Sequence, residues 1–319
     1  LEAHFKAMGV PLIPLREGAQ MLVDELLGSN PERVEIVMGG DPREVGLSGI
    51  QEGHYARFEV SVSQGSHPYL KDHSIKNVPV LPVVMVLDWF TRAAKASRRD
   101  LHLQGCHNLK VLKGISLGDY VKGESFKIVV DHEGNPDSAA LSLKLLGRGD
   151  VIHYTATANL SKMATAGIVK APAAELKPWN DAIYGDVLFH GPDFQVIQSV
   201  EGVGDAGGSA ILAGVKQAGW KGHWETSDPA ALDGGLQLAL LWGKKVLGGA
   251  TLPTGVGTYQ VHRQELVDEP IHCTVNRSKV EKSKAICDIQ FLSGEGQLLA
   301  ELQGVETHLL PSKKSTQRS

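Results

Sequence analysis

Two long segments of the chain carry apolar residues at helical spacing. Between Val83 and Ser97 the apolar residues recur every three or four positions, and Pro82 stands where a helix favours a first-turn proline. In the segment Pro229–Leu247 the apolar residues again gather on one side. The spacing therefore predicts one long helix in each half of the chain.

Short apolar runs separated by turns fill most of the remaining chain. Strand-like runs follow the first predicted helix at 109–111, 126–130, 141–146 and 151–160, and follow the second at 259–267, 271–279, 285–292 and 297–309. A further strand precedes each helix, at 58–62 and at 194–200, and residues 210–215 could pair with the latter. Residues 147–150 and 293–296 have the composition of hairpin turns.

The order of these elements repeats: a strand, a long helix, then a run of antiparallel strands, twice. The ends of the two repeats match best, since LKLLGRGDVIHYTATANL resembles IQFLSGEGQLLAELQGV in pattern. Such duplication predicts two similar halves packed side by side. A long antiparallel sheet wrapped around one long helix is the hotdog layout, so we expect an α+β double hotdog. Two unrelated α+β domains would fit the spacing as well.

The first fifty residues differ from the rest. Residues 17–27 predict a short amphipathic helix that Gly28 closes, and residues 33–38 predict a strand. One helix and one strand cannot bury a core, so this segment is interpreted as the end of a preceding domain. The expected organisation is a linker at 1–50, a first hotdog at 51–172, a second hotdog at 173–310 and a flexible tail at 311–319.

Composition and charge exclude several function classes. The chain has 319 residues with 32 Lys and Arg against 36 Asp and Glu, and it has no basic run, which argues against nucleic acid as a partner. Its longest apolar stretch, residues 78–87, is interrupted by Pro79 and Pro82, so no membrane span is expected. Three scattered cysteines that form no CxxC pair favour a reducing, cytoplasmic compartment. The 36 glycines fit a chain with many turns.

Three places carry side chains that could do chemistry. His73 ends a polar loop just before an apolar segment, where it could act as a base, although one of 13 histidines carries little weight by itself. Asp233 and Gln237 stand four residues apart on one face of an apolar helix, where burial would raise the pKa of the carboxyl group, as a general acid requires. Asp233 could equally be a first-turn residue favoured by the helix dipole, and Gln237 a solvated side chain. The segment FHGPDF at 189–194 is interpreted as a turn.

Two further patterns are set aside as chance matches. Residues 202–207 fit GxGxxG, but a strand-like run and no helix follows them, so a hairpin turn is expected instead of a dinucleotide site. His102, Cys106 and His107 lie close together, but no matching ligands stand at zinc spacing elsewhere.

Taken together, these residues resemble a dehydratase of the polyketide synthase type. That family carries a histidine in HxxxGxxxxP in the first half of a double hotdog, and an aspartate in DxxxQ/H in the second. Here His73 and Pro82 match the first motif, with Asn77 in place of the glycine. Asp233 and Gln237 match the second motif in full.

A third motif of the family, YGPxFQ, is present as HGPDFQ, with His190 in place of the tyrosine. The resemblance covers residues 52–310, and the segment before it resembles the end of a ketoreductase domain. The variants HPYLKDHSIKNVPVLP and FHGPDF are most similar to dehydratases of polyunsaturated fatty acid synthases. The residues expected to bind substrate are Asn77, Pro82, His190, Gly191, Pro192 and Phe194. Asn77 is expected to narrow the substrate tunnel or to reorient the loop of His73.

The resemblance implies removal of water from a 3-hydroxyacyl thioester. His73, neutral, would take the C2 proton, Asp233 would protonate the C3 hydroxyl group, and Gln237 would hold Asp233 or that hydroxyl in place. Backbone N–H groups of the helix after Pro82 would stabilise the thioester oxygen. The substrate would arrive on the phosphopantetheine arm of an acyl carrier protein, with no metal or diffusible cofactor.

The implied partners are the acyl carrier protein and neighbouring synthase domains, with room for a homodimer. Two alternatives stay open on the same fold. One is a non-catalytic acyl-binding or scaffold module, and the other is an enoyl isomerase or a cyclase.

Overall fold

The computed structural model of the protein describes residues 48–311, with gaps at 53–54, 99–100, 136, 164–166, 174, 186, 223, 225–227 and 264–265, together with residues 18, 19 and 23. Those three residues are helical and fall within the helix predicted at 17–27. The rest of that helix, the strand predicted at 33–38 and the tail from residue 312 lie outside the described residues. From Gly49 onward the described chain forms a single unit.

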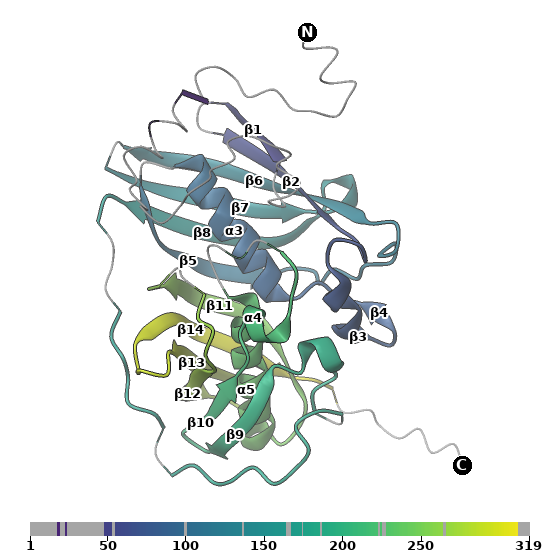
Figure 1. Cartoon of the computed structure of the whole chain (residues 1–319), viewed down its shortest axis with the longest axis vertical. Helices are drawn as coiled ribbons and strands as arrows, with labels where there is room; N and C mark the ends of the chain where they lie inside the picture. Colours follow the sequence, from purple (N-terminus) through teal and green to yellow (C-terminus); the bar gives the residue numbers. More distant parts are fainter. Residues whose placement is uncertain are drawn as a thin grey trace. The chain divides into compact units, whose positions relative to one another are not determined.

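Twelve strands form one continuous sheet, in which every described pair from β2 to β9 is antiparallel (Figure 1). In spatial order the strands are β1 (Ser48–Glu52), β2 (Tyr55–Val62), β6 (Glu124–Asn135), β7 (Ser138–Leu146), β8 (Ile152–Ser161), β5 (His102–Val111), β11 (Thr251–Val261), β14 (Leu298–Leu309), β13 (Lys284–Leu292), β12 (Ile271–Val280), β10 (Gly207–Leu212) and β9 (Ile197–Gly204). The first six come from the first half of the chain and the last six from the second. The two halves of the sheet join where β5 pairs with β11, with Cys106 opposite Tyr259.

One long helix lies against the strands of each half (Figure 1). Helix α3 (Val83–Ser97) packs on β5 to β8, and helix α5 (Pro229–Leu247) packs on all six strands from β9 to β14. Both helices have the bounds that the apolar spacing predicts. The arrangement is an α+β double hotdog, as expected from the repeat.

Helix α5 is apolar on nearly all sides because it is buried on nearly all sides, from Pro229 to Gly243. Its start is fixed by Asp228, whose side chain accepts a hydrogen bond from Ala231 N at 2.9 Å. Gly235 lets the helix approach β13 closely, since a Cβ atom there would lie 2.5 Å from Phe291 Cζ. A polar residue on such a helix has no route to solvent.

Some predicted strands are displaced in the structure. Residues Pro192–Phe194, predicted as strand, form a short 3₁₀ turn, and β9 begins only at Ile197, because Gly191 and Pro192 turn the chain. The strand predicted at 259–267 is wrong at its end: β11 ends at Val261, and Leu266 and Val267 line a cavity beside α5. Residues 202–207 lie at the β9–β10 hairpin, as predicted, with Gly204 opposite Gly207.

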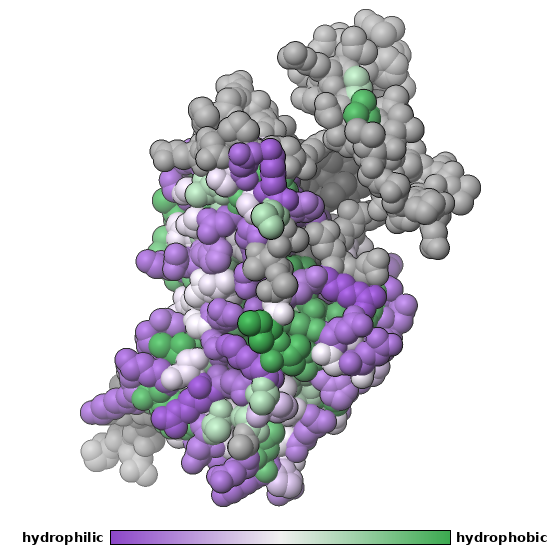
Figure 2. Space-filling view, turned by 90° about the vertical axis from the view of Figure 1, so that its left-hand side faces the viewer, coloured by the Kyte–Doolittle hydropathy of each residue, from purple (hydrophilic) through white to green (hydrophobic). Residues whose placement is uncertain are grey.

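The surface has a mixed character. The face seen in Figure 2 is covered mostly by hydrophilic side chains, with apolar patches between them. The formal net charge is −4. Within the described part of the chain, no helix is long and apolar enough to cross a membrane.

Candidate active site

The imidazole of His73 is held by the short hairpin that follows it. His73 ends the 3₁₀ turn Pro68–Asp72 and precedes β3 (Ser74–Ile75) and β4 (Val78–Pro79). Its Nδ1 lies 2.6 Å from Val80 O, and its backbone oxygen accepts from Val80 N at 2.8 Å. A carbonyl oxygen can only accept, so Nδ1 carries the hydrogen and Nε2 keeps the lone pair that a base needs.

Asp233 and Gln237 project from one face of α5, one turn apart. Gln237 Nε2 donates to Asp233 Oδ2 at 2.7 Å and to Phe194 O at 2.9 Å. Tyr184 donates its hydroxyl hydrogen to Gln237 Oε1 at 2.9 Å. Both Asp233 and Gln237 are buried, with exposures of 4% and 1%, so Gln237 is not the solvated side chain that the sequence left open.

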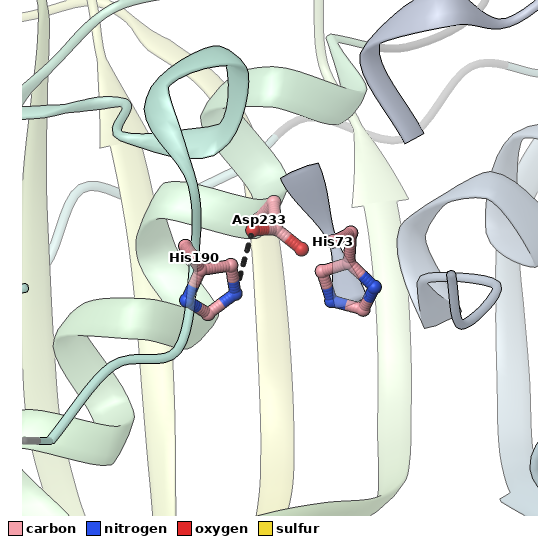
Figure 3. A group of neighbouring side chains, drawn as sticks. All are labelled: His73, His190 and Asp233. Carbon is pink, nitrogen blue, oxygen red and sulfur yellow. Dashed lines mark ion pairs between the residues drawn. The ribbon is translucent and has the colours of Figure 1, made fainter. Parts of the chain in front are cut away.

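His190 completes a group of three convergent polar side chains. Its Nε2 lies 3.6 Å from Asp233 Oδ2, and its ring stacks on Phe189 at 4.4 Å between centroids. One ligand atom each from His73, His190 and Asp233 lies within 4.8 Å of the others. Figure 3 shows the two imidazoles on opposite sides of the Asp233 carboxyl group, one oxygen facing each ring. His73 belongs to the first half of the chain, and the other two belong to the second.

Burial sets the protonation of this group. Burial lowers the pKa of His73 to about 4, and burial together with the neighbouring His73 lowers the pKa of His190 to about 3. Burial raises the pKa of Asp233 to about 7, against the opposing hydrogen bond from Gln237. Near neutral pH the site therefore holds two neutral imidazoles, and the carboxyl group keeps its proton up to about pH 7.

Asp72 joins the two loops that carry the histidines. Its backbone oxygen accepts from Gly191 N at 2.8 Å, and its Oδ2 accepts from Asp193 N at 2.7 Å. Gly191 is the point of closest approach, because a Cβ atom there would lie 2.8 Å from Asp72 Cγ. The loops cross without room for a side chain at this position.

Aromatic rings pack behind the two loops. Tyr69 stacks on Trp220 with 4.5 Å between ring centroids, and Phe194 lies 4.4 Å from Trp220 and 5.0 Å from His73. Trp220 Nε1 also donates to Asp193 O at 2.7 Å. The cluster links the segment before His73 to the segment after His190, so the relative position of the two histidines depends on it.

The structure brings together most of the residues singled out in the sequence. His73, His190, Asp233, Gln237 and Phe194 form the site, with Gly191 and Pro192 in the turn beside it. Pro82 is buried at the N-cap of α3.

Asn77 does not fit its expected role. It is exposed at the turn of the β3–β4 hairpin, with φ +64°, next to Lys76 at φ +52°. The expectation that its side chain narrows a tunnel is therefore wrong. A turn with two such residues needs positive φ, which glycine and asparagine both tolerate.

Two residues of the site carried no recognisable signal in the sequence. Tyr184 lies in a stretch without periodicity, and its role depends on the return of the chain past α5. Asp72 precedes His73 directly, but nothing in the sequence indicates that it meets Gly191.

The same three atoms of His73, His190 and Asp233 are the set that could hold a metal ion among the described residues. Imidazole nitrogen and carboxylate oxygen are ordinary ligands of divalent transition metals. A metal there would occupy the lone pair of His73 and the ionised form of Asp233. Metal binding and an acid–base pair are therefore mutually exclusive uses of this site.

Two family models match the chain. One, described as the polyketide synthase dehydratase domain, matches residues 49–141, and the other, described as the polyketide synthase dehydratase N-terminal domain, matches residues 167–317. One of the large subunits of the polyunsaturated fatty acid synthase of Thraustochytrium sp. (strain ATCC 26185 / S-3) is 24% identical over 318 residues, which make up 95% of this chain and 11% of that relative. The chain thus spans about a tenth of the length of this curated relative.

Solved structures share the fold at low sequence identity. The dehydratase domain from the CurF module of curacin polyketide synthase is 16% identical with a TM-score of 0.64, covering 84% of this chain and 99% of that chain. A dehydratase domain of a mycocerosic acid synthase-like polyketide synthase is 17% identical with a TM-score of 0.63, covering 87% and 99%. A bifunctional dehydratase-cyclase domain in ambruticin biosynthesis is 16% identical with a TM-score of 0.62, covering 84% and 98%.

Proposed function

Because the chain belongs to the polyketide synthase dehydratase family, we propose that it removes water from a 3-hydroxyacyl thioester to give a 2-enoyl thioester. One observation carries the proposal. A neutral imidazole with a free lone pair and a carboxyl group that keeps its proton up to about pH 7 converge from the two halves of one buried site. This is the pair that an elimination of water needs.

In the proposed reaction His73 Nε2 takes the C2 proton of the substrate. The electrons of that C–H bond form the C2–C3 double bond, and the C3–O bond breaks as Asp233 protonates the departing hydroxyl group. The base becomes imidazolium and the acid becomes carboxylate, so one proton must pass from His73 to Asp233 before the next turnover. Gln237 donates to Asp233 Oδ2 throughout and steadies the carboxylate that forms.

The thioester oxygen gains negative charge as the C2 proton leaves. The first backbone N–H groups of α3, which begins directly after Pro82, are the donors that we assign to it. No acidic side chain stands in the first turn of α3 to compete with that oxygen. No metal and no diffusible cofactor takes part in the proposed reaction.

The substrate is proposed to arrive on the phosphopantetheine arm of an acyl carrier protein. The much longer relative, which is part of a polyunsaturated fatty acid synthase, supports an origin in such a synthase, in the cytoplasm, with neighbouring domains as partners. A series of carrier-bound substrates of increasing length would then define which acyl chains the site accepts.

The test is a mass measurement on a 3-hydroxyacyl carrier protein or a short thioester mimic. The wild-type chain should produce the species lighter by one water, and His73→Ala and Asp233→Asn should each abolish it. His102→Ala and Asp181→Asn change the same residue types at exposed positions and should keep it. Full activity in either site variant would overturn the assignment of roles.

Two alternatives have distinct outcomes in the same assay. If the wild-type chain binds the acyl carrier protein but releases no water, an acyl-binding module is the better description. If it converts a 2-enoyl thioester to a 3-enoyl thioester or to a ring, the His73–Asp233 pair moves a proton along the chain or closes a ring. The pair is retained here, which favours dehydration.

A further inference from the structure

The hydroxyl group of Tyr184 connects the start of β9 to the amide of Gln237. It accepts a hydrogen bond from Ile197 N at 2.9 Å and lies 2.9 Å from Gln237 Oε1. Since the Ile197 N–H already donates to the phenol oxygen, the phenol hydrogen is free to point at Gln237 Oε1. Burial raises the pKa of Tyr184 well above its usual value, so the phenol keeps that hydrogen over the whole working range of pH.

The amide of Gln237 has a single orientation that suits its neighbours. Its Nε2 lies 2.9 Å from Phe194 O, which can only accept, and its Oε1 faces the donating hydroxyl of Tyr184. Turning the amide over would place an oxygen against the Phe194 carbonyl and an NH₂ group against a hydroxyl hydrogen. The second hydrogen of Nε2 is thereby directed at Asp233 Oδ2, 2.7 Å away.

This orientation decides which oxygen of Asp233 holds the acid hydrogen. Oδ2 accepts from Gln237, and the carbonyl-type oxygen of a protonated carboxyl group is the better acceptor, so the hydrogen stands on Oδ1. In Figure 3 Oδ2 faces His190 and the other oxygen faces His73. We propose that Tyr184 is a positioning residue which, through Gln237, keeps the acid hydrogen of Asp233 on the oxygen that faces His73.

The inference rests on the proposed function and explains a requirement of it. The base must reach C2 and the acid must reach the oxygen on C3 of the same substrate, so both must address one small volume. With the amide turned over, Gln237 Oε1 would accept a hydrogen from Oδ2. The acid hydrogen would then point along α5 instead of toward His73.

The test compares Tyr184→Phe with wild type by following the Asp233 carboxyl carbon in a ¹³C NMR pH titration without substrate. The variant keeps the ring and frees the amide, which weakens donation to the ionised form of Asp233. Its pKa should rise by about half to one unit, the size of one hydrogen bond. Tyr154→Phe removes a phenol from an equally buried tyrosine on β8 and should leave the Asp233 titration unchanged.

Kinetics provide the second measurement. For Tyr184→Phe we expect kcat to fall about 3–10-fold with little change in KM, and the alkaline limb of the pH profile to move up with the pKa. In a background of Gln237→Ala, Tyr184→Phe should have no further effect on kcat or on the Asp233 titration. The double-variant cycle separates a residue that acts through Gln237 from one that only supports the fold.

Three results would overturn the inference: an unchanged Asp233 titration in Tyr184→Phe, a fall in pKa, or additive effects in the double variant. None of them depends on dehydration. A wild-type chain that releases no water would reject the proposed function, while the NMR titration would still decide the role of Tyr184.

Discussion

Gly191→Ala is expected to misalign the two histidine loops without removing any polar group. A Cβ atom at position 191 would lie 2.8 Å from Asp72 Cγ and 2.9 Å from Asp72 Cβ and Oδ1. The backbone of Gly191 has φ −77° and ψ 179°, which any residue adopts, so the effect of the substitution is steric and not conformational.

The magnitude follows from how far Asp72 must move. Carbon atoms pack at about 3.5–4.0 Å, so relieving the contact requires a displacement on the order of 1 Å. Asp72 directly precedes His73, and it also holds Asp193 N at 2.7 Å, so the displacement passes to both loops of the site. A shift of about 1 Å in a catalytic group costs roughly 100-fold in kcat, and overpacking of this kind costs about 1–3 kcal/mol of unfolding free energy.

The assay is release of water from a 3-hydroxyacyl thioester, with thermal unfolding measured in parallel. Gly114→Ala is the matched control, because a Cβ atom there meets nothing within 4 Å, and it should change neither kcat nor Tm. If Gly191→Ala keeps wild-type kcat and Tm, the loops are not held in register by this crossing. If only Tm falls, the crossing supports the fold but does not align His73.

Three further results are expected. The kcat/KM should follow a bell with limbs near pH 4 and pH 7, because His73 must be neutral and Asp233 protonated; a pH–rate profile should give a value at pH 8 about one tenth of that at pH 6, and a basic limb that rises with pH would contradict this order. Asn77→Gly should leave Tm nearly unchanged while Asn77→Val lowers the unfolding free energy by about 1–2 kcal/mol, since a β-branched residue resists φ +64°; equal Tm values in calorimetry would show that the turn relaxes. Trp220→Ala should cost about 3–5 kcal/mol in a denaturant titration and Trp220→Phe much less, because the stack on Tyr69 and the bond to Asp193 O are lost in turn; a smaller loss in the alanine variant would mean that the cluster repacks.

The periodic parts of the fold could be predicted from the sequence because their patterns are local. The bounds of α3 and α5, and most strands between them, follow from apolar spacing alone. The end of β11 could not, since Leu266 and Val267 are as apolar as a strand but fill a cavity beside α5. Apolar character reports burial, and strand and cavity wall are equally buried.

The catalytic pair could be found in the sequence, but its supports could not. His73 and Asp233 stand in motifs with fixed spacing. Tyr184 reaches Gln237 across 53 residues, and Asp72 reaches Asp193 across 121, so neither partner is visible from its own neighbourhood. Asn77 illustrates the opposite error, because interpreting a motif position by side-chain size misleads where the turn requires only a positive φ.

The inverted protonation of the site follows from the hotdog architecture itself. A helix wrapped by a sheet is buried on almost every side, so a carboxyl group placed on it, such as Asp233, loses water as an automatic consequence of folding. The same crowding holds the His73 ring against Val80 O and makes its charged form costly. Each half of the chain thus shifts one group away from its ordinary protonation, and the two shifts overlap between about pH 4 and pH 7. The acid and the base require no partner charge to reach their working states, so the residue at the third corner is free to vary. His190, where the family has tyrosine, can therefore change the fit of the substrate while the pair that exchanges protons with it stays as it is.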